Sequence, residues 1–299
     1  MQRNRQLIFH TVNAVKSLLA IALLGAALSS CVTLDLRPTK RIEALVFVVE
    51  DYDVSRTITY PYSSELEVYR ALRDTFNLDS VLANVSTPHE KVMKLTDFTH
   101  GLGLKLERDF NHDLNVGDLM VEMRSDEKLP HNSPAVLLTG AAQAIGLNAR
   151  TVFLMTNDCQ ETKEGSGHFI TEVWMDEVGR WAMFDPEYNI VPVVGDYPLS
   201  ALDLQSSIIN NRPYRFMRNG SEVSKDVRVD YLKFIPHHLF YFATAYDQRV
   251  APDKPTRHGD FTHLLLVPSE VEIPVIFQRE YLLDAYEVTH NKAWFYAAP

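Results

Sequence analysis

The sequence predicts an α+β domain in which an antiparallel sheet packs on one buried central helix. The helix is predicted from Ser133 to Gly146, because this segment is rich in alanine and leucine, has a proline near its start and carries small apolar residues on several sides. Three apolar segments follow at 151–155, 169–175 and 181–184. Glycine and acidic residues separate the last two segments, which is typical of a hairpin.

Further elements are predicted before this centre. The apolar run 44–49 is expected to form a first strand. Ser64 and Glu67 have the spacing of a capping box, which predicts a helix start. Thr87, followed directly by a proline, predicts a second helix that glycine ends at Gly101.

The segments on either side of the predicted sheet are less regular. Residues 104–132 are polar and form a long connection, of the kind that shapes a site. From Pro192 onward, short segments interrupted by prolines predict a mostly β C-terminal extension. Within it, 286–288 and 294–296 are expected to pair as a closing hairpin.

The N-terminal thirty residues have the order of a secretory signal. They carry Arg3, Arg5 and Lys16 and no acidic residue, and the apolar run 17–28 follows within them. A run of about 12 residues is too short to cross a bilayer as a helix, so we expect it to be removed. The predicted organisation is a signal peptide at 1–30, a tether at 31–43, a core domain at 44–195 and the C-terminal extension at 196–299.

The end of the signal segment carries a second motif. The sequence Leu28-Ser29-Ser30-Cys31 resembles the lipobox of bacterial lipoproteins, whose cysteine receives diacylglycerol and further acyl chains. This resemblance implies that Cys31 is lipidated and ties the domain to a membrane. Val32, in place of aspartate, implies retention at the outer membrane, with the domain facing the periplasm.

The amino-acid composition limits the classes of partner that the chain is expected to bind. The chain has 29 Lys and Arg residues against 39 Asp and Glu, a formal charge of −10, which argues against nucleic acid as a partner. The membrane is therefore expected to be a partner through the acyl chains. Cys31 and Cys159 are the two cysteines, so a lipidated Cys31 leaves no internal disulfide. No cofactor is expected.

Four segments resemble the transglutaminase-like branch of the papain-like cysteine hydrolase superfamily. Ala144–Arg150 is similar to the family's helix exit, His168–Val173 to its HxWxEV strand, and Trp181–Pro186 to its WxxxDP strand. The helix after Thr87 corresponds to the one that precedes the catalytic segment. The resemblance covers about residues 88–190 and implies that His168 and Asp185 occupy catalytic positions.

The resemblance also implies where the nucleophile should be. A catalytic thiolate is stabilised at a helix N-terminus beside an imidazolium that an aspartate orients. Counting back from Gly146 by the family's usual spacing leads to His131, so the sequence departs from the family at the atom that performs the chemistry.

Three interpretations remain open at this point. In the first, His168 and Asp185 are retained for packing and hydrogen bonding in an inactive domain that binds or scaffolds. In the second, an enzyme recruits Cys159, Ser133 or a water activated by His168. In the third, His131, His168 and Asp185 bind zinc or iron.

The first interpretation gives the preferred prediction. We expect a lipid-anchored periplasmic pseudoenzyme that binds a peptide or a cell-envelope polymer such as a polysaccharide. The alternative is a cell-envelope amidase, protease or amide transferase that uses Cys159 or another nucleophile with His168 and Asp185.

Overall fold

The structure is a computed structural model that describes residues 45–53, 55–250 and 252–299. The predicted signal peptide at 1–30 and the tether at 31–43, with Cys31, lie outside the described residues. The helices are α2 (Glu67–Phe76), α3 (Leu78–Val81), α4 (Pro88–Gly101), α5 (Val116–Glu122), α6 (Ser133–Ala144), α7 (Ala201–Ile209), α8 (Lys225–His238) and α9 (Lys292–Phe295). Among these described helices, none combines the length and the apolar character that a membrane span requires.

A six-stranded sheet forms the centre of the fold. Its strands are β1 (Ala149–Met155), β2 (Gly167–Met175), β3 (Arg180–Phe184), β8 (Tyr241–Ala245), β9 (His263–Leu266) and β12 (Tyr286–Thr289). Their spatial order is β12-β9-β8-β1-β2-β3, and all neighbours are antiparallel except β12 and β9. The predicted strands at 151–155, 169–175 and 181–184 are therefore confirmed as β1, β2 and β3, and the α+β class with them.

Two smaller sheets complete the strand inventory. One contains β4 (Val191–Val194), β5 (Tyr197–Pro198), β6 (Arg215–Arg218) and β7 (Ser221–Glu222), and the other contains β10 (Ile276–Phe277) and β11 (Tyr281–Leu282). The C-terminal part of the chain supplies β8, β9 and β12 to the central sheet, so it extends the sheet that β1–β3 begin.

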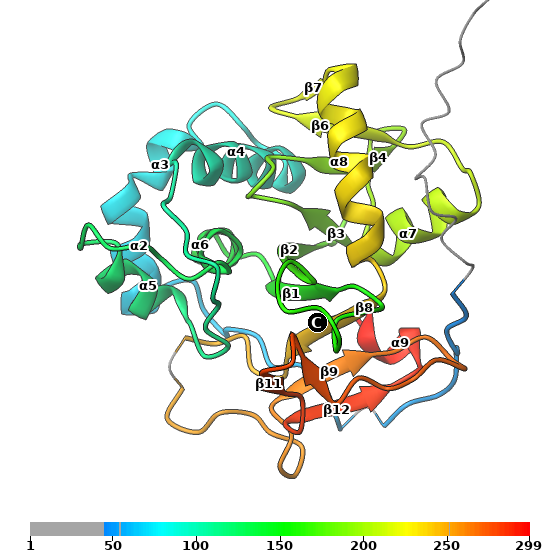
Figure 1. Cartoon of the computed structure of the whole chain (residues 1–299). Coiled ribbons are helices and arrows are strands. Elements are labelled where there is room, and N and C mark those ends of the chain that lie inside the picture. The colour runs from blue at the N-terminus through cyan, green and yellow to red at the C-terminus, as the bar shows by residue number, and fades with distance from the viewer. Residues whose placement is uncertain (1–44, 54, 251) are drawn as a thin grey trace, which may run out of the picture. The chain divides into compact units, whose positions relative to one another are not determined.

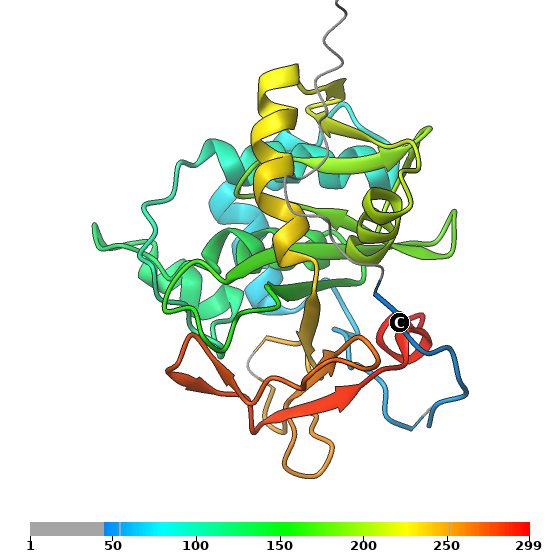
Figure 2. The same ribbon diagram turned by 45° about the vertical axis from the view of Figure 1, so that its right-hand side comes forward.

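Helices cover both faces of the central sheet. Figures 1 and 2 show α2–α6 on one side of it and α7 and α8 on the other. Along β1 the alternating side chains of Val152 and Leu154 join the apolar cluster under α7 and α8, while Phe153 points to the opposite face. Both faces are buried over residues 152–155, the apolar part of β1.

Local sequence explains the helices that hold the site. The capping box predicted at Thr87 is present, because the Thr87 side chain accepts a hydrogen bond from the Glu90 amide and the Glu90 side chain returns to Thr87. Helix α6 is buried along its whole length, as its composition predicts, and Gly146 follows with the positive φ of 85° that favours glycine.

Several local predictions were wrong. Residues 45–49 form no strand, and Val48 makes only an isolated bridge to Asn291. Helix α2 has Leu66 as its N-cap, without the capping box predicted from Ser64. The predicted closing hairpin is absent, because β12 pairs in parallel with β9 and residues 292–295 form α9.

Candidate functional site

His131 lies at the head of α6, two residues before its first turn. The loop around it is fixed by backbone and side-chain bonds: the His131 amide donates to the Asp109 carbonyl at 2.8 Å, and the Asn132 side chain donates to the Asn111 carbonyl at 2.7 Å. Asn132, rather than the predicted Ser133, is the N-cap residue. The connection at 104–132 thus holds the His131 backbone in place, and it is not wholly irregular as predicted, because it contains helix α5.

His168 and Asp185 meet on the other side of the same site. His168 lies on β2, and Asp185 follows β3 directly, where it bridges to Ile190. His168 Nε2 is 2.8 Å from Asp185 Oδ2, and both side chains are fully buried. The pairing that the family resemblance implies is therefore present in the structure.

Asp185 is held by three further donors. The Tyr231 hydroxyl donates to Oδ2 at 2.8 Å, and the amides of Glu187 and Tyr188 donate to Oδ1 at 3.1 Å each. Tyr231 comes from α8, so the C-terminal part of the chain contributes to the site. With its oxygens shared among four donors, Asp185 is fixed as the carboxylate that orients His168.

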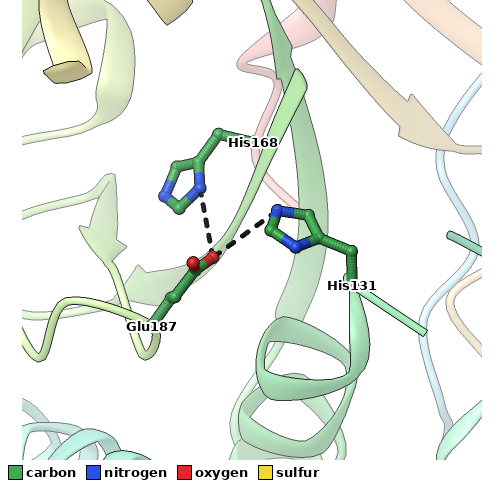
Figure 3. Close-up of side chains that lie close together, drawn as sticks. All are labelled: His131, His168 and Glu187. Atoms are coloured by element: carbon green, nitrogen blue, oxygen red, sulfur yellow. Dashed lines mark ion pairs between the residues drawn. The ribbon is translucent and has the colours of Figure 1, made fainter. Parts of the chain in front are cut away.

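A second carboxylate, Glu187, joins the two histidines. Glu187 Oε2 lies 3.6 Å from His131 Nε2 and 3.5 Å from His168 Nδ1. Figure 3 shows both imidazole rings directed at the same oxygen of this carboxylate. The sequence prediction placed Asp185 in this three-residue cluster, but the structure places Glu187 there, because Asp185 is occupied on the far nitrogen of His168.

Burial and neighbouring charges act differently on the two histidines. Burial lowers the pKa of His131, and the charge of Glu187 only partly opposes this. Burial also acts to lower the pKa of His168, but the charge and hydrogen bond of Asp185 more than offset it, so the pKa of His168 is raised. Burial and the neighbouring carboxylates thus shift the pKa values of His131 and His168 in opposite directions.

Cys159 belongs to a different environment. It is fully buried in an apolar cluster with Phe153, Tyr241 and Phe277. Burial raises the pKa of its thiol to about 12, opposite to the lowering that a nucleophile requires. Among the described residues, no hydrogen bond joins this thiol to His168.

Ser133, the other candidate nucleophile, is the first residue of α6 and is fully buried. Within the described part of the chain its hydroxyl has no hydrogen-bond partner, so no base is in position to activate it. Of the candidates named from sequence, the structure brings together His131, His168 and Asp185, and leaves Cys159 in the neighbouring apolar cluster.

Two residues within the family-like segments have a structural role that sequence reasoning missed. Arg150 and Glu172 form a fully buried ion pair between β1 and β2, with a nitrogen–oxygen distance of 2.7 Å. The guanidinium also lies 4.3 Å above the ring of Trp181. The sequence signal that could have predicted this ion pair is the presence of opposite charges at two facing positions of adjacent antiparallel strands.

A cavity of about 310 Å³ lies against α6 and the sheet. Its lining includes Asn132 and Phe169, whose ring centroid is 6.4 Å from that of His131, but none of His131, His168 and Glu187 lines it. Arg257, an exposed cation, also lines it. A lining with polar and apolar residues suits a ligand that carries both polar and apolar groups.

Comparisons with known proteins give a family match and a structural match. The family model of the transglutaminase-like superfamily matches residues 78–186. No curated protein matches the sequence. Among solved structures, a candidate protease from Parabacteroides distasonis is similar over 60% of this chain at 11% identity, with a TM-score of 0.26. This chain spans 40% of the length of that protein.

Proposed function

Residues 78–186 form a transglutaminase-like domain, and from this premise we propose that the chain is a lipid-anchored cell-envelope protein that performs no cysteine-dependent acyl transfer and binds a peptide or envelope polymer instead. One observation carries the proposal. An imidazole, that of His131, occupies the head of α6, where the family resemblance implies the nucleophile, and its Nε2 lies 3.6 Å from Glu187 Oε2. Cys159 cannot replace it from an apolar cluster that raises the pKa of its thiol to about 12.

The cavity beside α6 supports a binding role. It has the volume of a small-ligand site, about 310 Å³. Its Phe153 and Phe169 rings stack at 4.4 Å and offer an apolar wall, while Arg257 offers a cation to a carboxylate. Peptides from the cell envelope carry both features, so they are the ligand class that this lining favours.

Charge reversal at Arg257 tests the binding proposal. We expect the full-length protein in detergent to bind soluble peptidoglycan fragments that carry stem peptides, and Arg257→Glu to weaken this binding about fivefold, since one partly exposed ion pair contributes about 1 kcal/mol. Titration calorimetry provides the measurement. Arg212→Glu, an exposed arginine outside the cavity lining, is the matched control and should bind as the wild type does. Binding that both substitutions leave unchanged, or no binding at all, would refute the proposed site.

Substitution of Cys31 tests the anchor separately. Stable attachment requires acyl chains, because the acidic chain offers no electrostatic attraction to anionic lipids. We therefore expect the wild type to sediment with membranes and Cys31→Ala to appear in the soluble fraction or to remain unprocessed with its signal segment. Fractionation and intact-mass measurement distinguish these outcomes from a lipid-independent attachment, in which the variant would still sediment as a processed chain.

A further inference from the structure

We propose that His131, His168 and Glu187 bind a divalent transition metal ion, with zinc as the first candidate. The inference does not depend on the proposed function, since it requires neither the membrane nor a polymer ligand. Two imidazoles and one carboxylate are a ligand set that zinc and iron both accept.

The distances from Glu187 to the two histidines fit a metal ion better than they fit hydrogen bonds, and all three donor atoms lie within 4.8 Å of one another. Glu187 Oε2 lies 3.6 Å from His131 Nε2 and 3.5 Å from His168 Nδ1. Two ligands bound to zinc at 2.0–2.1 Å and a tetrahedral angle are about 3.4 Å apart. A charged N–H···O bond has a length of about 2.7–2.9 Å, so both observed distances are too long for direct pairing.

An unpartnered buried atom points to the same position. His168 Nδ1 is inaccessible to solvent and has no hydrogen-bond partner among the described residues. Such an atom costs about 1–3 kcal/mol unless something binds it. Figure 3 shows that this nitrogen faces the Glu187 carboxylate, on the side where His131 also approaches. A metal ion there would satisfy the orphaned atom.

The surroundings of His168 match those of a metal-bound imidazole. Metal-ligating histidines usually donate their second ring N–H to a carboxylate, which fixes the tautomer and the ring. Asp185 accepts from Nε2 in this way at 2.8 Å, and Tyr231 in turn donates to Asp185. Asp185 would therefore act as a positioning residue that leaves Nδ1 free to bind.

The cluster also leaves room for a further ligand. The side chains of His131 and Glu187 are 27% and 30% exposed, whereas His168 is fully buried. Three protein ligands with one side open to solvent are typical of zinc sites at which a water or a substrate group completes the coordination.

Zinc titration of the full-length, untagged protein after chelator treatment tests the proposal. We expect one zinc ion per chain, with a dissociation constant below about 1 µM, and a higher melting temperature in the presence of zinc. His131→Gln and Glu187→Gln keep side chains of similar size at half-exposed positions, and each should weaken zinc binding at least about 100-fold. Their melting temperatures should no longer respond to zinc.

Matched substitutions away from the cluster serve as controls. His237→Gln on α8 and Glu177→Gln in the turn between β2 and β3 remove the same functional groups at accessible positions, and both should bind zinc as the wild type does. Clearly substoichiometric zinc in the wild type would overturn the proposal. Equal zinc binding by wild type, His131→Gln and Glu187→Gln would overturn it as well, because the ion would then be bound elsewhere.

Discussion

Glu172→Ala is expected to lower the free energy of unfolding by about 3–5 kcal/mol. Glu172 accepts two hydrogen bonds from the Arg150 guanidinium, at 2.7 and 3.2 Å, and one from the Ala201 amide at the start of α7. Removal of the carboxylate leaves Arg150 charged and fully buried, with only the Phe295 carbonyl and aromatic rings around it. Urea unfolding followed by circular dichroism measures the loss.

The contrast with an exposed ion pair makes this prediction specific. Asp230 and Lys233 on α8 are paired at 2.8 Å, but their side chains are 75% and 70% exposed. Asp230→Ala should therefore change the unfolding free energy by less than about 0.5 kcal/mol. A loss below about 1 kcal/mol for Glu172→Ala would show that the buried pair does not hold β1, β2 and the C-terminal segment together.

Asp185→Ala is the second substitution with a large expected effect, a loss of about 3–4 kcal/mol. It removes the acceptor for His168 and Tyr231, both fully buried, and for the amides of Glu187 and Tyr188. Tyr231→Phe removes one of these bonds without leaving a charge unpaired, and should cost about 1–2 kcal/mol. Thermal and urea unfolding of the two variants gives the comparison. Equal losses would mean that Asp185 contributes through Tyr231 alone.

The core of the fold could be predicted because its signals are local. The Thr87 cap and the composition of α6 determine two helices, and apolar runs of strand length determine β1, β2 and β3. The same reasoning did not predict helix α8 in the C-terminal part, because Pro236 lies inside it. The parallel pairing of β12 with β9 joins segments whose partners no local pattern specifies.

The candidate site was predictable in part for the same reason. His168 and Asp185 lie on a strand and at a strand end, so their motif fixes their relative positions. Glu187 was missed because its position depends on the turn after β3, in which Asp185 bridges to Ile190 and Asn189 adopts a positive φ of 52°. Tyr231 was missed because α8 approaches the site from about 46 residues further along the chain.

The two proposals lead to different views of His131. An imidazole at position 131 prevents cysteine-dependent acyl transfer, because it cannot form a thioester. For metal binding the same imidazole is useful, because it adds a second nitrogen donor beside His168 Nδ1 and Glu187 Oε2. Both proposals require the same arrangement of residues: position 131 at the head of α6 faces His168, and Asp185 orients His168.

The pKa of a thiol introduced at position 131 tests this arrangement directly. The variant His131→Cys, combined with Cys159→Ala, places a sulfur at the head of α6, beside His168. A helix N-terminus and a neighbouring imidazolium lower a thiol pKa well below the free value of about 8.5. The rate of alkylation at residue 131, resolved by peptide mass and followed against pH with chelator present, reports this pKa.

We expect the introduced thiol to show a pKa below about 7, and His168→Gln to raise it toward the free value. In the same assay the wild-type Cys159 should react slowly at neutral pH, since burial raises its pKa to about 12. A pKa of about 8.5 or higher for the introduced thiol, unaffected by His168→Gln, would contradict the assignment of His131 to the nucleophile position of a transglutaminase-like domain.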